Sequence, residues 1–235
     1  MPTHTKVLSA KRAYEFGVDA IRLTALSSHA VLQLLQQTFS FQQVAITSPP
    51  ETFGPVAATN PPGIVCQLGY LQSTQDLVVP IRAIIIEPRR IVIDIAAPSS
   101  FVDSVYERFN EVLATVMSAD GEPILSGQPT QKDYSELSAK LDLTLDQFFH
   151  PAVYSLLKAA SDCESDGLVL PRIQLSCSTL GATYAGDAGA ATALQLSLRV
   201  GSKWEDKTFF SAAMLDSSRH EKYLADLERV LRAGA

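Results

Sequence analysis

The clearest pattern in the chain is a series of apolar residues spaced three and four positions apart between residues 101 and 117. This spacing places them on one side of an α-helix, so it predicts an amphipathic helix. Ser100 and Asp103 stand where a helix start favours a capping hydroxyl and a carboxylate near the free amide groups. The apolar positions are Val102, Val105, Tyr106, Phe109, Val112, Leu113 and Val116.

Two strands are predicted directly before this helix. Residues 77–86 are almost wholly apolar, which is typical of a strand with both faces covered, or with one face covered by a partner. Ile91, Ile93 and Ile95 alternate with other residues and complete a hairpin that turns at Pro88.

Earlier in the chain, a strand is predicted over residues 13–24 and a helix from Ser28 to Phe39, followed by a short strand over 42–47. Residues 48–63 hold five prolines, so neither a helix nor a central strand is expected there, and the segment is predicted to be a long loop. A strand with one buried face follows, and that face is formed by Ile64, Cys66, Leu68 and Tyr70.

The second part of the chain is expected to follow a similar order. Residues 137–146 alternate cleanly and predict a strand, and a helix is expected to begin near His150. Further strands are predicted over 168–180, 194–200 and 208–215, and a last helix from Ser218. The residues expected on the buried side of the last helix are Tyr223, Leu224, Leu227, Val230 and Leu231.

These patterns predict an α+β fold of two related halves, each with a strand, a helix, three or four antiparallel strands and a helix. A shift of 118 residues places 91–113 on 209–231 and sets Ser100 on Ser218. The expected architecture is a mainly antiparallel sheet packed by long helices. The predicted parts are a flexible N-terminal tail (1–12), a first half (13–118), a linker (119–133) and a second half (134–235).

The alternative to duplication is two ordinary α+β segments that share a common pattern. The predicted order of elements is similar to the repeat of the TATA-binding-protein fold, but the chain carries no sequence motif of that family. The similarity therefore concerns topology alone, and topology does not carry function.

The charge and composition limit the classes of partner. The net charge is −6, with −1 over residues 1–117 and −5 over 118–235, so nucleic acid is not expected as a partner. No apolar stretch is long enough to cross a membrane, and the N-terminus lacks the apolar core of a secretory signal. Cys66, Cys163 and Cys177 show no paired spacing. Cys66 and Cys177 lie in strand-like alternation, which favours buried thiols in a reducing compartment, so a cytoplasmic location is expected.

The sequence contains no catalytic or metal-binding signature, and no cofactor is expected. His29 and His150 lie near predicted helix starts, where a neutral or capping role is favoured over acid–base catalysis. The glycine-rich segment 181–189 lacks the lysine of a nucleotide-binding loop and leads into a strand, so it is interpreted as a hairpin loop.

Five residues are binding candidates: Arg82, Arg89, Arg90, Tyr70 and Tyr184. The arginines are candidates for gripping carboxylate or phosphate groups, although arginines at strand ends also protect edges and pair with acids such as Glu87. The two tyrosines are candidates for lining a pocket between sheet and helices.

Two functions follow from these expectations. The first is a non-enzymatic protein–protein interaction module, such as an adaptor, assembly factor or chaperone-like subunit, whose apolar sheet surface binds another protein or a second copy. The alternative is a small-molecule-binding or enzymatic domain with a pocket between sheet and helices.

Overall fold

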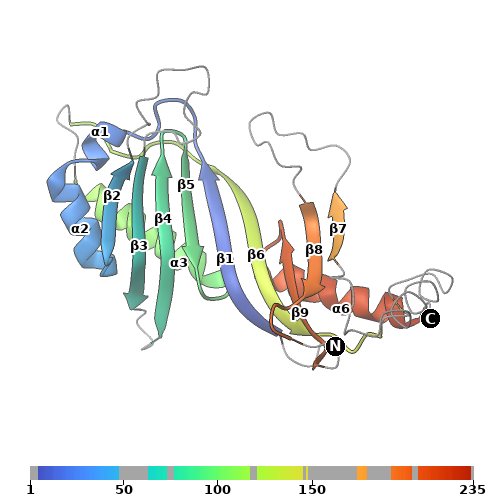
Figure 1. Cartoon of the computed structure of the whole chain (residues 1–235). Coiled ribbons are helices and arrows are strands. Elements are labelled where there is room, and N and C mark those ends of the chain that lie inside the picture. The colour runs from blue at the N-terminus through green and yellow to red at the C-terminus, as the bar shows by residue number, and fades with distance from the viewer. Residues whose placement is uncertain are drawn as a thin grey trace, which may run out of the picture. The chain divides into compact units, whose positions relative to one another are not determined.

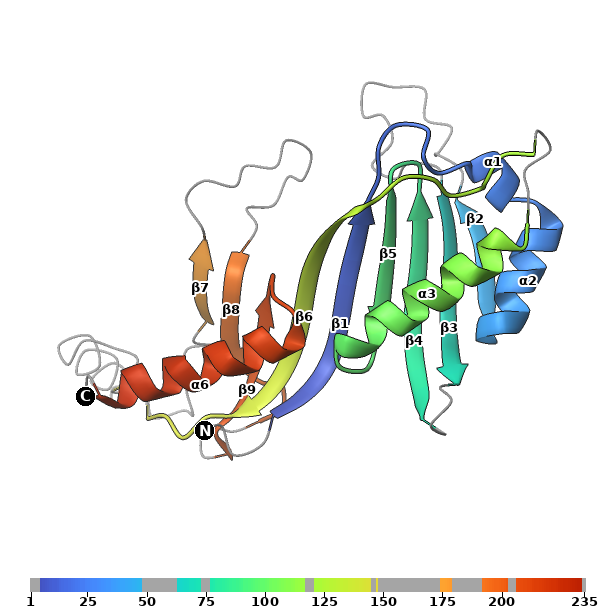
Figure 2. The ribbon, with the colours of Figure 1, turned by 180° about the vertical axis from the view of Figure 1, so that it is seen from behind.

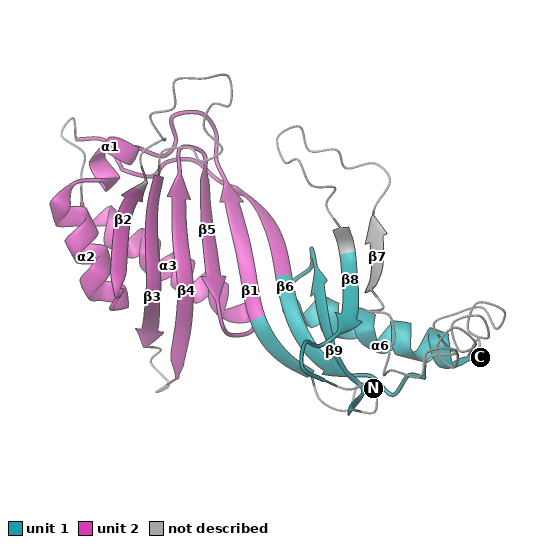
Figure 3. Ribbon diagram, in the orientation of Figure 1, with its two compact units in different colours: residues 1–8, 135–235 teal, residues 9–134 magenta. Residues whose placement is uncertain are grey.

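The computed structural model describes residues 5–47, 63–72, 77–116, 121–144, 147, 174–178, 192–202 and 206–233. In this part of the chain the fold is α+β, with a large antiparallel sheet and few helices (Figure 1). The chain forms two compact units: residues 1–8 with 135–235 (unit 1), and residues 9–134 (unit 2) (Figure 3). Strands β1 (Thr5–Glu15) and β6 (Thr130–Lys140) contribute residues to both.

Unit 2 contains a sheet with the strand order β2-β3-β4-β5-β1-β6, in which the pairs from β2 to β1 are antiparallel. Helices α2 and α3 lie on one face of this sheet, which Figure 2 shows from the helix side. Besides β1 and the start of β6, its elements are α1 (Leu23–Leu26), α2 (His29–Phe39), β2 (Gln43–Thr47), β3 (Gly63–Gln72), β4 (Val78–Glu87), β5 (Arg90–Ile95) and α3 (Ser100–Ala114).

Helix α3 is the predicted amphipathic helix, and its apolar positions Val102, Val105, Phe109, Val112 and Leu113 are buried in the core of unit 2. Its start differs from the prediction. Ser99 occupies the N-cap position and its side chain makes no capping hydrogen bond, while Ser100 is already helical. Asp103 does lie in the first turn, but its carboxylate binds the guanidinium of Arg12.

Strand β4 buries one face and leaves the other accessible. Ile81, Ile84 and Ile86 are buried on the helix side, whereas Val78 and Arg82 are exposed. The expectation that the chain covers both faces is therefore not met within the described residues. The alternative expectation, that a partner covers the second face, stays a prediction.

The first strand lies closer to the N-terminus than predicted. Residues 5–12, expected as a tail, belong to β1, while Val18 is 71% exposed in a turn instead of being buried in a strand. Polar residues are tolerated in β1 because they have partners: Ser9 donates a hydrogen bond to Asp94, and Arg12 to Asp133. A search for apolar alternation does not detect a strand stabilised in this way.

The predicted linker over 119–133 is also corrected in its described part. Residues 130–133 belong to β6, and residues 124–126 are held against residues 20–22 by backbone hydrogen bonds. Ile124 is buried in the core of unit 2.

Strand β3 contains an irregularity that reverses its predicted faces. Ile64 and Cys66 are buried as expected, but Leu68 and Tyr70 are 58% and 44% exposed. Leu68 has a φ of 56° and is left out of the pairing with β4, so the residues after it face the opposite way. Gly69 thereby faces the end of α2.

Gly69 is required by this close approach. A Cβ atom added at Gly69 meets the Phe41 ring at 2.5 Å and the Phe39 carbonyl oxygen at 2.6 Å. Gly69→Ala is expected to lower the free energy of unfolding by about 1–3 kcal/mol, because a backbone oxygen cannot move aside freely. Urea denaturation measures this loss. Gly17→Ala, where nothing lies within 4 Å of the added atom, is the matched control and should change stability by less than about 0.5 kcal/mol.

Unit 1 contains the strand order β6-β9-β8-β7 and helix α6 (Ser217–Ala233). The strands that follow β6 in the chain are β7 (Gln174–Ser178), β8 (Thr192–Leu198) and β9 (Thr208–Ala213). Leu137, Leu141, Leu196, Phe209 and Leu224 are among the residues that form its core.

The buried face of α6 is rotated from the predicted one. Leu224 is buried and Leu227 is partly buried, but Tyr223 and Val230 are 45% and 62% exposed. Glu228 is buried in their place, because its carboxylate accepts hydrogen bonds from the Asp142 amide and from Arg232. A polar residue that is satisfied in this way carries no signal in an apolar pattern.

Several predictions lie outside the described residues: the loop over 48–62, the helix from His150, Cys163, and the segment 181–189 with Tyr184. The internal duplication stays a prediction, since the first helix of the second half is among them.

Candidate functional site

The face of unit 2's sheet opposite α2 and α3 carries a continuous row of apolar side chains. Cross-strand pairing places Ala45 beside Val65, Val65 beside Ile85, Ile85 beside Val92, and Val92 beside Ala13. These five residues, here called the apolar row, cross β2, β3, β4, β5 and β1. At the usual strand spacing the row is about 19 Å long. All five side chains are half-buried, and their chain neighbours Ile64, Ile84, Ile91 and Tyr14 face the helices.

Charged residues border the apolar row on both sides, and they are paired with one another. On one side Arg90 binds Glu87 at 2.8 Å, and Lys132 binds Glu15 at 2.7 Å. Arg90 lies beside both Glu87 and Glu15 in the sheet register. Arg90 and Lys132 therefore each have a carboxylate counter-charge.

The charged residues on the other side of the row are also paired. Lys11 lies 3.4 Å from the Asp94 carboxylate, which also accepts a hydrogen bond from Ser9 at 2.8 Å. Lys11 lies over the ring of Tyr134 as well, 5.4 Å from its centroid. The apolar row therefore has polar residues on both sides, and the charged residues named here are paired with one another.

Further along β3 and β4 the same face is more exposed. Tyr70 pairs with Pro80, and Gln72 pairs with Val78. Tyr70 is 44% exposed and Val78 52% exposed, while their neighbours Val79 and Ile81 are buried on the helix side. This end of the β3–β4 hairpin adds accessible apolar surface to the face of the sheet opposite α2 and α3, here called the helix-free face.

The structure distributes the predicted binding residues over different places. Arg89 and Arg90 lie at the turn between β4 and β5, where Arg90 pairs with Glu87 in the hairpin. Arg82 is exposed at an irregularity near the other end of β4, and Tyr70 is on the helix-free face. The three arginines are thus not brought together, and Tyr184 lies outside the described residues.

Beneath α3, the nearly buried Arg12 forms the centre of a polar cluster. Its Nε atom lies 2.6 Å from Asp133, and its guanidinium also binds Asp103. Burial opposes the charge on Arg12, but the hydrogen bond from Arg12 to Asp133 and the charges of both carboxylates outweigh it and raise the pKa of Arg12. With both carboxylates engaged, the cluster fastens β1, β6 and α3 of unit 2 to each other.

A second buried polar cluster lies in unit 1 around His220. Nδ1 of His220 is 2.9 Å from the Ser135 hydroxyl and Nε2 is 2.8 Å from the Ser211 hydroxyl. Burial lowers the pKa of His220 from 6.5 to about 4, so the ring is neutral near pH 7. His220 has no exposed surface, and both serines are also fully buried. A group closed off in this way cannot reach a substrate, so its role is structural.

The described residues contain no cluster of three His, Cys, Asp or Glu side chains able to hold a metal ion. Cys66 is free and buried, and burial raises the pKa of its thiol to about 12, which keeps it protonated and unreactive. None of the described helices has the length and apolar character needed to cross a bilayer.

Sequence reasoning missed the apolar row and the clusters around Arg12 and His220. The row depends on the register of four strand pairings, which alternation within a single strand does not reveal. His220 had one weak signal, because it lies four residues before the buried Leu224 on the same side of the helix.

No protein-family model and no curated protein sequence matches the chain.

Proposed function

We propose that the protein is an interaction module whose helix-free sheet face binds an apolar surface of another protein. The observation that carries this proposal is the apolar row, five neighbouring apolar side chains on five strands. In the part of the chain that the structure describes, these five residues do not belong to the hydrophobic core of unit 2, which lies on the side of the sheet that faces the helices. Contiguous apolar surface with a polar border is typical of protein-binding sites.

The pairing of the border charges indicates the chemistry of the partner. Lys11, Lys132 and Arg90 each have a carboxylate neighbour, so none of these three cations offers an unpaired charge to a phosphate backbone. A protein with apolar side chains at its centre and hydrogen-bonding groups around them fits this arrangement. The exposed Tyr70 and Val78 provide a second contact region at the end of the β3–β4 hairpin.

The test replaces the centre of the row with polar side chains that still suit a strand. Val92→Thr combined with Ile85→Thr keeps β-branched side chains, which suit a strand, but introduces hydroxyl groups into the contact. The variant should lose the partner, with binding weakened by about tenfold or more, as expected for about 1.4 kcal/mol or more of lost contact energy. Tagged protein isolated from its own cells under gentle conditions, followed by quantification of the bound partner, measures the loss.

Val18→Thr is the matched control, because Val18 is 71% exposed in a turn of the same unit and lies outside the row. This control should retain the partner at the wild-type level. A double variant that keeps its partner, with unchanged folding by circular dichroism, would refute the proposal. If the partner proves to be a second copy, the apparent mass depends on concentration and the double variant shifts it to the monomer.

A further inference from the structure

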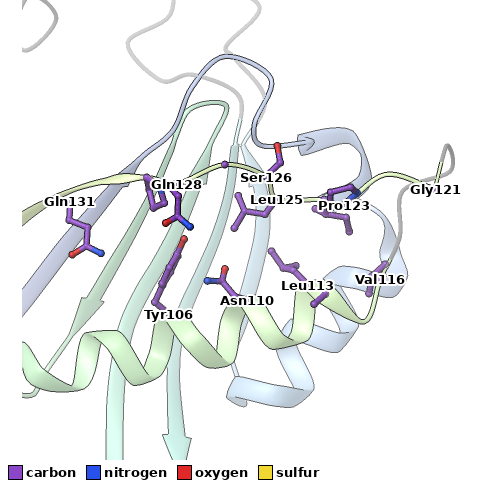
Figure 4. Close-up of a pocket in the computed structure, with 14 residues that line it drawn as sticks. Tyr106, Asn110, Leu113, Val116, Gly121, Pro123, Leu125, Ser126, Gln128 and Gln131 are labelled. Carbon is purple, nitrogen blue, oxygen red and sulfur yellow. The ribbon is translucent and has the colours of Figure 1, made fainter.

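Unit 2 contains a pocket of about 500 Å³ between α3 and the segment that leads into β6 (Figure 4). Oδ1 of Asn110 makes no hydrogen bond to the described residues, but it is buried, so a ligand in the pocket cannot reach it. The groups that can select a partner lie instead at the outer edge of the sheet, which β2 forms.

Strand β2 pairs with β3 on one side, and no described strand pairs with it on the other. The amide of Gln42 donates a hydrogen bond to the Leu68 carbonyl at 3.2 Å. Antiparallel pairing alternates from there, so the backbone amide and carbonyl of Val44 face β3, whereas those of Ala45 point outward from the sheet. An edge of this kind is a ready template for a further strand.

This end of unit 2 is free of charge. Residues 23–47, which include α1, α2 and β2, contain no Asp, Glu, Lys or Arg, although 19% of the whole chain is charged. Figures 1 and 2 show α2 beside β2 at this end of the sheet. Edge strands that stay unpaired are commonly protected by a charge or a proline, and β2 contains neither. Depletion of charged residues is typical of the centre of a protein interface.

The sequence of β2 is complementary to itself when two copies run antiparallel about Ala45. Val44 of each copy then lies opposite Ile46 of the other, and both are β-branched apolar residues that suit such a pair. Val44 and Ile46 lie on the helix side of the sheet, because their partners in β3, Cys66 and Ile64, are buried there. Ile46 is 54% exposed in the single chain, and this pairing covers it.

From this arrangement we propose that two copies of the protein associate through β2, which pairs antiparallel with the β2 strand of the second copy about a two-fold axis at Ala45. The outward amide and carbonyl of Ala45 bond to those of Ala45 in the second copy. Copies with a net charge of −6 repel each other, and contact through an uncharged surface keeps this repulsion small. The association uses the edge of the sheet and not its face, so it does not depend on the proposed protein-binding function.

Sedimentation equilibrium of the full-length protein measures the association, and hydrogen exchange locates it. A contact through one short strand and its neighbours is small, so a monomer–dimer Kd of about 10–100 µM is expected. At a protein concentration about ten times the Kd, the Ala45 amide should exchange about fivefold more slowly than in dilute solution, because only the dimer protects it. The Val44 amide faces β3 in the single chain already and should change much less. Equal exchange of the Ala45 amide at both concentrations would overturn the proposal.

Ile46→Lys assigns the contact to the edge, because it places a charge where the second copy docks, and it should raise the Kd by at least about tenfold. Val18→Lys makes the same change of charge at a side chain that is 71% exposed in a turn, so its Kd should match that of the wild type. Ile85→Thr combined with Val92→Thr alters the face and should leave this dimer intact. A protein that is monomeric at all concentrations, or a dimer that persists in Ile46→Lys, would overturn the proposal. The exchange comparison needs no variant, so it decides even if Ile46→Lys does not fold.

Discussion

Phe109→Ala is expected to lower the free energy of unfolding by about 3–5 kcal/mol, the range seen when a buried phenylalanine is truncated. Phe109 lies at the centre of the apolar side of α3, has no exposed surface and belongs to the core that joins α3 to the sheet of unit 2. The loss of its ring removes buried apolar surface and leaves a cavity that rigid neighbouring strands cannot close. Urea denaturation monitored by circular dichroism measures the effect.

Glu107→Ala, two positions away on the exposed side of α3, is the control and should change stability by less than about 0.5 kcal/mol. The comparison holds the helix and the replacing residue constant and changes only burial. A loss below about 1 kcal/mol for Phe109→Ala would mean that α3 is not packed on the sheet as described.

Acidification is expected to remove about 3 kcal/mol of stability through His220 alone, because its pKa falls from 6.5 to about 4 on burial. Above about pH 6.5 the ring is neutral in both the folded and the unfolded chain, and the full stability is present. Between pH 6.5 and pH 4 the unfolded chain binds a proton that the folded chain does not. Stability therefore falls as the pH falls through this window, and the loss is complete below pH 4.

The variant His220→Gln isolates this contribution from that of other acidic and basic groups. Glutamine does not titrate but can still hydrogen-bond to Ser135 and Ser211, which lie on either side of the imidazole. Urea denaturation of both proteins from pH 7.5 to pH 4 should show a steeper loss in the wild type. Parallel curves would show that the folded state does not depress the pKa of His220.

The sequence predicted those elements whose burial is expressed by apolar spacing alone. Helix α3 is the best example, since its five buried positions are all apolar and were all expected. The same reasoning placed Leu227 at the equivalent position of α6, but Leu227 is only partly buried, because His220 and Glu228 turn the helix toward their own hydrogen-bond partners. Leu227→Ala should accordingly cost less than Phe109→Ala.

The proposed binding face was only partly predictable. The apolar character of residues 77–86 suggested a strand with a second apolar face, and the outward position of Ile85 agrees with this. The row itself depends on pairing between residues that lie far apart in the sequence, such as Ala13 and Val92. The alternation within one strand does not show how that strand aligns with its neighbours. The irregularity at Leu68 changed the outcome again, because it turned Tyr70 to the accessible face.

Chemical cross-linking with mass spectrometry of the native complex tests the proposed protein-binding face most directly. Lys11 and Lys132 border the apolar row, whereas Lys207 and Lys222 are in unit 1. The proposal predicts cross-links from Lys11 and Lys132 to peptides of a bound protein, with few or none from Lys207 and Lys222. Partner cross-links confined to Lys207 and Lys222, or a gently isolated protein that is monomeric and bound to nothing, would contradict it.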